Sequence, residues 1–168
     1  MLIGLAIIPI GLALSTQPQG NSETGTKAPG FTLPAVSSGS LTTESIALSS
    51  YKGKVVLLEF MEPWCGHCQK MAPVLDRLHS KYAPLGVVFI SVAGSEGGAT
   101  LSDVARFVSS YRVGWPVVYD QSNAVLKDYG VSSVPVFFVV SKNGSILSKF
   151  TGEVPYETLD SVLSRAVE

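Results

Sequence analysis

The chain has 168 residues, 46% of them apolar and 15% charged, which is enough for one well-packed core and argues for a single domain. Its formal net charge of −1 gives no electrostatic reason to expect nucleic acid or a strongly acidic substrate as a partner. No block of five or more like charges occurs, so no charged tail indicates a partner either.

The N-terminal residues differ in composition from the rest of the chain. Residues 2–14 carry no charge, and an apolar run of this length suits a signal peptide better than a spanning helix of about 20 residues. A buried core helix is the alternative, but Pro9 and two glycines disfavour it. We expect residues 1–15 to be a signal peptide or membrane anchor, residues 16–26 a flexible tether, and residues 27–168 a domain outside the cytoplasm, secreted or tethered to the membrane.

Strand and helix patterns alternate in the rest of the chain. Short apolar runs predict strands, helical spacing of apolar residues predicts helices, and Asn143-Gly144 predicts a hairpin. The predicted strands are 55–61, 87–93, 115–119, 134–140 and 145–150; the predicted helices are 66–82, which contains Pro73, 100–108, 123–129 and 156–167. This order predicts an α/β fold, a mixed central sheet with helices on both faces.

Both cysteines of the chain fall in the run EPWCGHCQKMAP, residues 62–73. The predicted strand leads directly into the predicted helix, so Cys65 lies at a helix N-terminus, where the dipole and free N–H groups favour a thiolate. Cys68, one turn further on, is close enough to form a disulfide with it. Such a pair can exchange two electrons: Cys65 attacks a partner disulfide and Cys68 resolves the mixed disulfide.

Other uses of two cysteines are less favoured by the surrounding residues. A structural disulfide is compatible with the spacing alone. A zinc site needs more ligands, and the only histidines are His67 and His79. Haem attachment requires a histidine directly after the second cysteine, where this chain has Gln69. We therefore expect redox chemistry with no metal and no cofactor.

The run VVLLEFMEPWCGHC at 55–68 resembles the thioredoxin superfamily, and its CGHC is typical of protein disulfide isomerases. The whole layout is more similar to TlpA/ResA-like thiol-disulfide oxidoreductases, which are membrane-tethered or secreted. That resemblance extends to APGFTLP at 28–34, IALSSYKGKVVLLEF at 46–60, RVGWPVVYD at 112–120 and YGVSSVPVFFVVSKNGSI at 129–146. It implies a thioredoxin-like fold with an inserted helix and strand after the second core strand.

The resemblance also implies roles for particular residues. Cys65 is the nucleophile and Cys68 the resolving thiol. Val134-Pro135 corresponds to the cis-proline loop, which faces the disulfide and pairs with the substrate backbone; an ordinary proline at the start of a strand is the alternative. The implied partners are cysteine-containing exported proteins and a membrane thiol-disulfide electron donor.

Glu59 lies inside an apolar strand, at the position where the superfamily carries a buried acid that exchanges protons with the resolving cysteine. Burial is expected to raise its pKa toward the range of a general base. The alternative is a carboxylate that faces solvent or a lysine. The family's lysine near this acid is absent, and Ser91 or its neighbours occupy the region.

Three residues around the cysteines are expected to tune the redox pair: Trp64, Gly66 and His67. Trp64 is expected to shield the disulfide. A protonated His67 would stabilise the Cys65 thiolate and make the protein more oxidising.

Thiol-disulfide exchange with exported proteins, as a reductant, is the predicted function. A disulfide isomerase or oxidant remains open because of CGHC. A thiol peroxidase would need a Pro-x-x-Thr/Ser-x-x-Cys run, but Glu62 occupies the Thr/Ser position. A copper-binding module of this fold spaces its cysteines differently. Some family members that act in cytochrome c maturation carry an acid shortly after the second cysteine. This chain has Gln69, Lys70 and Met71 there, which weakens the prediction of apocytochrome clients.

Overall fold

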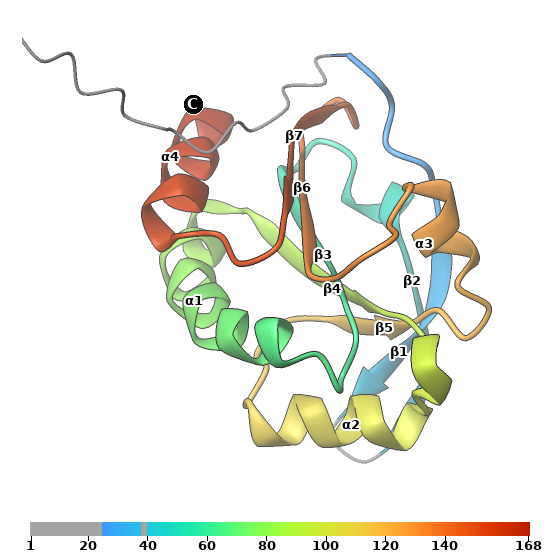
Figure 1. Ribbon diagram of the computed structural model, residues 1–168. Helices are drawn as coiled ribbons and strands as arrows, with labels where there is room; N and C mark the ends of the chain where they lie inside the picture. The colour runs from blue at the N-terminus through green and yellow to red at the C-terminus, as the bar shows by residue number, and fades with distance from the viewer. Residues whose placement is uncertain (1–24, 38–39) are drawn as a thin grey trace, which may run out of the picture.

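The computed structural model describes residues 25–37 and 40–168, with the backbone alone at 40–43. A seven-stranded mixed sheet in the order β2-β1-β5-β4-β3-β6-β7 forms its centre (Figure 1). β3, β4 and β5 are parallel, and the other pairs are antiparallel. The strands are β1 (Thr32–Ser37), β2 (Ser40–Ala47), β3 (Val56–Met61), β4 (Val88–Ala93), β5 (Val117–Tyr119), β6 (Val136–Val140) and β7 (Ile146–Thr151).

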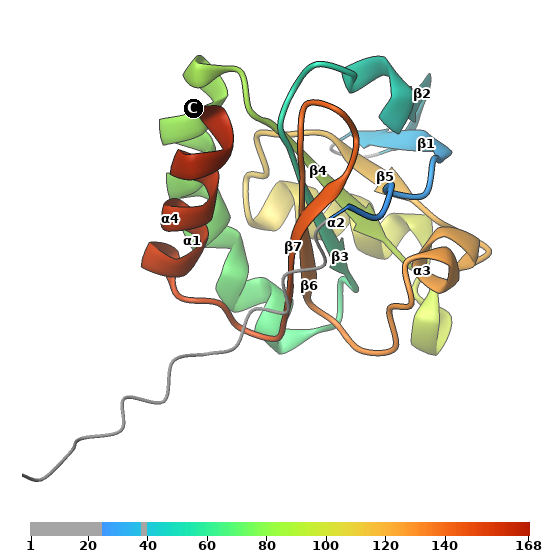
Figure 2. The ribbon, with the colours of Figure 1, turned by 90° about the horizontal axis from the view of Figure 1, so that it is seen from above.

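Helices cover both faces of the sheet, as the sequence predicts. α1 (Gly66–Tyr82) and α4 (Tyr156–Val167) lie side by side on one face, and α3 (Ala124–Asp128) lies on the other (Figures 1 and 2). α2 (Leu101–Ser110) and β5 form the predicted insertion after β4. Short 3-10 turns occupy 48–51, 83–85 and 96–98. The thioredoxin-like architecture is confirmed, and the boundaries of the predicted elements differ from the observed ones by at most two residues.

The hairpin of β1 and β2 was not predicted. β2 is rich in serine and threonine, and Pro34 interrupts the short apolar stretch of β1, so neither shows the apolar run from which the other strands are recognised. β1 is held instead by pairing with β5, which places Val36 opposite Val117. That contact joins segments far apart in the sequence, and no local pattern encodes it.

The predicted signal or anchor at 1–15 and most of the predicted tether at 16–26 lie outside the described residues. The last residue of that tether, Thr26, is already bonded into the domain, because its carbonyl accepts a hydrogen bond of 2.8 Å from the Ile146 N–H. Among the residues that the structure describes, no helix is long and apolar enough to span a membrane.

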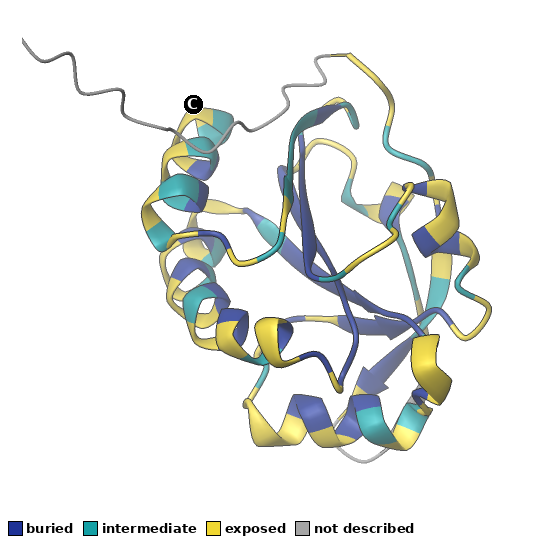
Figure 3. Ribbon diagram, viewed as in Figure 1, coloured by how far each residue is buried: buried dark blue, intermediate teal, exposed yellow. Residues whose placement is uncertain are grey.

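β3 is buried on both faces, and its alternation positions the site. Leu58 and Phe60 face the core under α3, while Leu57 faces the core under α1 and α4. Glu59 points to the same face as Leu57, because side chains alternate along a strand. The central strands are buried along their length, whereas the outer sides of the helices are exposed (Figure 3).

Candidate active site

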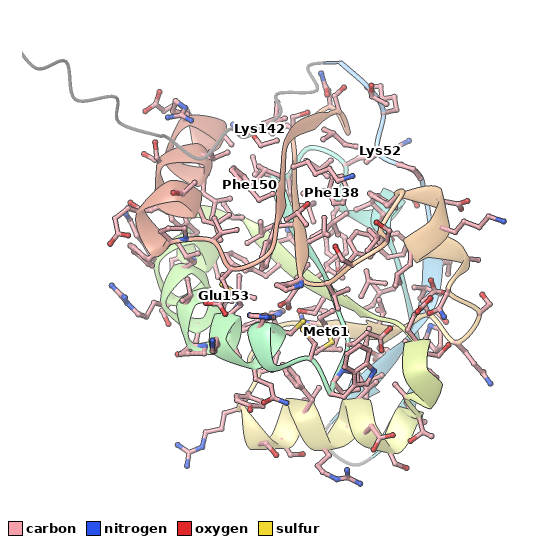
Figure 4. The ribbon with its side chains drawn as sticks, in the orientation of Figure 1. Lys52, Met61, Phe138, Lys142, Phe150 and Glu153 are labelled. Atoms are coloured by element: carbon pink, nitrogen blue, oxygen red, sulfur yellow. The ribbon has the colours of Figure 1, made fainter. Side chains whose placement is uncertain are left out.

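The directions of the strands bring four loops together at one end of the sheet, at the C-terminal ends of its parallel strands. The parallel strands β3, β4 and β5 all end there, and β6, antiparallel to β3, begins there, with Phe60 opposite Val136. The loop after β3 carries the two-cysteine motif, and the loop before β6 carries Val134-Pro135. Met61 and Glu153 lie toward this end of the domain, and Lys52 and Lys142 lie at the opposite end (Figure 4).

The two cysteines are free thiols at the start of α1. Cys65 is the N-cap residue, and its sulfur accepts a hydrogen bond of 3.2 Å from the Cys68 N–H. Cys65 is 5% exposed and Cys68 is fully buried. Burial, the Cys65 sulfur and the charge of Glu59 raise the pKa of Cys68 far above its ordinary value. Cys68 is therefore a protonated thiol until a base removes its proton.

Glu59 is buried among the side chains behind Cys68, so the alternative of a solvent-facing carboxylate is wrong. Its Oε2 accepts a hydrogen bond of 2.5 Å from Ser91 Oγ, which accepts one of 2.8 Å from Trp115 Nε1. Its Oε1 has no hydrogen-bond partner in the part of the chain that the structure describes. Burial raises the pKa of Glu59 to about 7, and the Ser91 bond opposes this. The free oxygen and the pKa suit a proton acceptor for a neighbouring thiol.

His67 is exposed between the cysteines, next to Gly66, the first residue of α1. Its Nδ1 lies 2.5 Å from Glu153 Oε1, on the loop after β7, and Lys70 Nζ lies 3.0 Å from the same oxygen. The hydrogen bonds from His67 and Lys70 lower the pKa of Glu153. The Glu153 carboxylate in turn offsets part of the positive charge that these two side chains bring to the motif. The redox-tuning roles of Gly66 and His67 stay predictions.

Trp64, the residue directly before Cys65, is exposed over 58% of its surface. Its Nε1 donates a hydrogen bond of 2.9 Å to the Glu96 carbonyl, in the loop after β4. The indole therefore lies against that loop, close to Gly97. Its expected role as a shield of the disulfide stays a prediction.

The Val134–Pro135 peptide bond is cis, as the resemblance implies. The Cys65 thiol donates a hydrogen bond of 3.6 Å to the Val134 carbonyl, so this loop directly faces Cys65. Pro135 is buried at the start of β6, and Val134 is partly exposed. Their role in binding a client backbone stays a prediction.

A cavity of about 450 Å³ opens beside Cys65, and we name it the Cys65 pocket. It is lined by residue 62, by residues 64–67, by Glu96, by Leu126 and by residues 131–134. Glu62 is 1% exposed at its wall. Within the described residues, no group of three or more histidine, cysteine, aspartate or glutamate side chains could hold a metal ion.

Sequence reasoning missed three contributors to this site. From the sequence, Glu62 was noted only because it occupies the Thr/Ser position of a thiol peroxidase motif. A carboxyl directly after a buried strand is nevertheless a usable signal. Trp115, whose Nε1 donates to Ser91 Oγ, lies in the predicted strand 115–119 and was assigned no role in the site. Glu153 is 86 residues from its partner His67, so only the fold brings the two together.

The chain resembles a well-defined group of proteins. Residues 24–149 match the model of the AhpC/TSA family. The thiol-disulfide oxidoreductase ResA of Bacillus thuringiensis subsp. konkukian is 33% identical over 143 residues, which cover 85% of this chain and 78% of the relative. ResA of Geobacillus kaustophilus is 32% identical over 136 residues, which cover 81% of this chain and 74% of the relative.

Solved structures agree with the sequence relatives. A protein assigned as the thiol:disulfide interchange protein DsbE from Chlorobium tepidum superposes with a TM-score of 0.78 at 27% identity, covering 88% of this chain and all of the other. The thioredoxin domain of a thiol-disulfide oxidoreductase from Bacteroides vulgatus gives a TM-score of 0.71 at 24% identity, with 83% and 97% coverage, and supports the fold alone.

Proposed function

This chain belongs to the AhpC/TSA family and is a thiol-disulfide oxidoreductase of the ResA type, and on that premise we propose that it delivers electrons to the disulfides of exported proteins. Its clients are cysteine-containing proteins. The named relatives do not favour the alternatives of an isomerase, a thiol peroxidase or a copper carrier.

Each turnover moves two electrons from the dithiol to the client. Cys65 first loses its proton to solvent. Its thiolate attacks one sulfur of the client disulfide, the client S–S bond breaks, and a mixed disulfide forms while the other client sulfur leaves as a thiolate that takes a proton from solvent. Glu59 then accepts the proton of Cys68, and the Cys68 thiolate attacks the Cys65 sulfur. The Cys65–Cys68 disulfide forms as the bond from Cys65 to the client breaks, and the second client thiolate takes the proton that Glu59 accepted. The cis Val134–Pro135 loop holds the client backbone against Cys65.

The contact between His67 and Glu153 carries the proposal that the protein is a reductant. A free imidazolium beside Cys65 would stabilise the thiolate and favour an oxidant. Here the ring nitrogen and Lys70 Nζ share one carboxylate oxygen of Glu153, which offsets part of that positive charge. The CGHC sequence therefore does not by itself imply oxidising behaviour.

The protein works outside the cytoplasm in this proposal, with residues 1–15 as signal peptide or membrane anchor. Once oxidised, the dithiol must be reduced again before the next turnover. A membrane thiol-disulfide electron donor is the partner that would supply those electrons.

The reduction potential of the Cys65–Cys68 pair tests the proposed direction. The protein is equilibrated with glutathione buffers of known ratio, and the fraction of disulfide is measured after acid quenching and alkylation. A potential below roughly −240 mV, near thioredoxin, is expected for a reductant. A potential above roughly −190 mV, near protein disulfide isomerase, would contradict it and favour disulfide formation or reshuffling.

A further inference from the structure

Glu62 is a buried carboxyl that the exchange reaction does not use. Its Oε1 accepts a hydrogen bond of 3.0 Å from the Glu96 N–H. Its Oε2 is buried and has no partner among the described residues. The backbone approaches Oε1 so closely at Gly94 that a side-chain Cβ there would collide with it. One oxygen is therefore fixed by the loop after β4. The other has an unused acceptor position, which a group entering from the pocket reaches once the side chains that cover it move aside.

The surroundings of Glu62 are apolar on the walls and acidic near the carboxyl. Leu126, Val131 and Val134 line the Cys65 pocket together with Glu62 and the exposed Glu96. Burial and the negative charges of Glu96 and Asp120 raise the pKa of Glu62 to about 7, against the lowering effect of the Glu96 N–H. A cation beside the free oxygen would stabilise the ionised form of Glu62 against both the cost of burial and the repulsion from Glu96 and Asp120.

Among the described residues, no lysine or arginine lines the pocket, so none of them supplies that cation. His67, the one basic residue in the described part of the lining, is already paired with Glu153. A pocket that is lined in part by apolar side chains and has a carboxyl at its wall suits a side chain with a long aliphatic stem and a cationic end. Arginine binds carboxylates best through two oxygens, and only one is free here, so the ammonium group of lysine fits better.

We propose that the Cys65 pocket binds a lysine side chain of the client, close in sequence to the client's reactive cysteine, with Glu62 Oε2 as the acceptor. This inference rests on the proposed function and names a class of client for it. The pocket includes Cys65 itself, so a lysine held there places a neighbouring client disulfide against the nucleophile. Clients with an acidic residue at the same place are disfavoured by Glu62 and Glu96.

A peptide series tests this preference on the wild-type protein. Each peptide carries one disulfide. The peptides differ at a single position near one of the cysteines, which holds lysine, norleucine or glutamate. The two positions before that cysteine and the two after it are varied in turn. The rate of reduction by the full-length reduced protein is measured by stopped flow. Each rate is divided by the rate of the same peptide with dithiothreitol, because a nearby charge alters the intrinsic reactivity of a disulfide.

At one of the positions, lysine is expected to react about tenfold faster than norleucine, the size of one charge-assisted hydrogen bond, and glutamate more slowly still. Glu62→Gln is expected to reduce the ratio of lysine to norleucine to nearly one, and Glu96→Gln to reduce it in part. Glu157→Gln, an exposed carboxylate on α4, is the matched control and is expected to keep the full ratio.

The two proposals fail separately. Equal normalised rates for lysine and norleucine at every position would overturn the lysine pocket while leaving disulfide reduction intact. A preference that survives in Glu62→Gln would overturn the role of Glu62. No reduction of any peptide would overturn the proposed function itself. If Glu62→Gln does not fold, the wild-type series alone still decides, since it involves no substitution.

Discussion

Glu59→Gln is expected to stabilise the folded protein and, at the same time, to slow its thiol-disulfide exchange. The gain in stability depends on pH. Burial raises the pKa of Glu59 from 4.5 to about 7, so the folded state keeps a proton that the unfolded chain releases. An acid whose folded pKa lies above its unfolded pKa makes stability fall as pH rises between the two values. At about 1.4 kcal/mol for each pKa unit, the free energy of unfolding falls by roughly 3 kcal/mol as the pH rises from below 4.5 to above 7. Glutamine cannot ionise and avoids the loss.

Urea unfolding of the reduced proteins measures this directly. The difference in the free energy of unfolding between Glu59→Gln and wild type is expected to be near zero at about pH 4 and to approach roughly 3 kcal/mol at about pH 8.5. Glu62 also has a pKa of about 7, but both proteins contain it, so its contribution cancels in the difference. Glu157→Gln, at an exposed position on α4, serves as the control and is expected to match wild type at both ends of the range.

Stopped-flow thiol exchange on the same variant tests the proton transfer. The resolving attack by Cys68 is expected to slow at least about tenfold at neutral pH, because its proton has lost its acceptor. A stability difference that is constant with pH, or that grows toward acid, would refute the buried, ionisable Glu59 on which both effects rest. An unchanged rate of exchange with the expected stability profile would refute only the proton-acceptor role.

Three further substitutions test other contacts of the site. Ser91→Ala removes the hydrogen bond that lowers the pKa of Glu59, so the pH profile of the resolving step is expected to move upward by up to about one pH unit; an unmoved profile would show that Ser91 does not set this pKa. Cys68→Ser is expected to trap clients as mixed disulfides with the nucleophilic cysteine, seen by mass spectrometry under non-reducing conditions, and a variant that still releases client would contradict the assigned order of attack. Glu153→Gln frees His67 and is expected to raise the reduction potential by roughly 10 to 20 mV; a potential that stays the same or falls would remove the support for a reductant.

The sequence predicts the parts of this fold that depend on local pattern. The strands around Glu59 and Val136 are continuous apolar runs, and α1 begins directly after a strand, so the central elements are recognisable without a structure. The β1–β2 hairpin is different. Its strands are polar at many positions, and β1 is stabilised by pairing with Val117 and Val118 of β5. Such a contact exists only once the sheet has formed.

The same distinction applies to the site. Cys65 and Cys68 are adjacent on one turn, and Glu59 stands out as a charge within a buried strand, so sequence alone identifies all three. The contacts that set their properties are not local. Ser91 is 32 residues from Glu59, and Glu96 is 34 residues from Glu62. The identity of the reactive groups can thus be predicted from the motif, whereas their electrostatics depend on which loops the sheet brings together.

Glu59 and Glu62 are both buried and have a pKa of about 7, but Glu59 lies within β3 and Glu62 at the wall of the Cys65 pocket, and this separates their tasks. Glu59 shares a face of the sheet with Ser91 and acts electrostatically on Cys68, which no client can reach because Cys68 is fully buried. Glu62 lines the pocket beside Cys65, which a client must occupy before the first attack. A client lysine that binds Glu62 therefore acts before the mixed disulfide forms, whereas Glu59 acts only afterwards, when Cys68 loses its proton. Substitution of Glu62 should consequently alter the rate of the first attack and its dependence on client sequence, and substitution of Glu59 should alter the second attack equally for all clients.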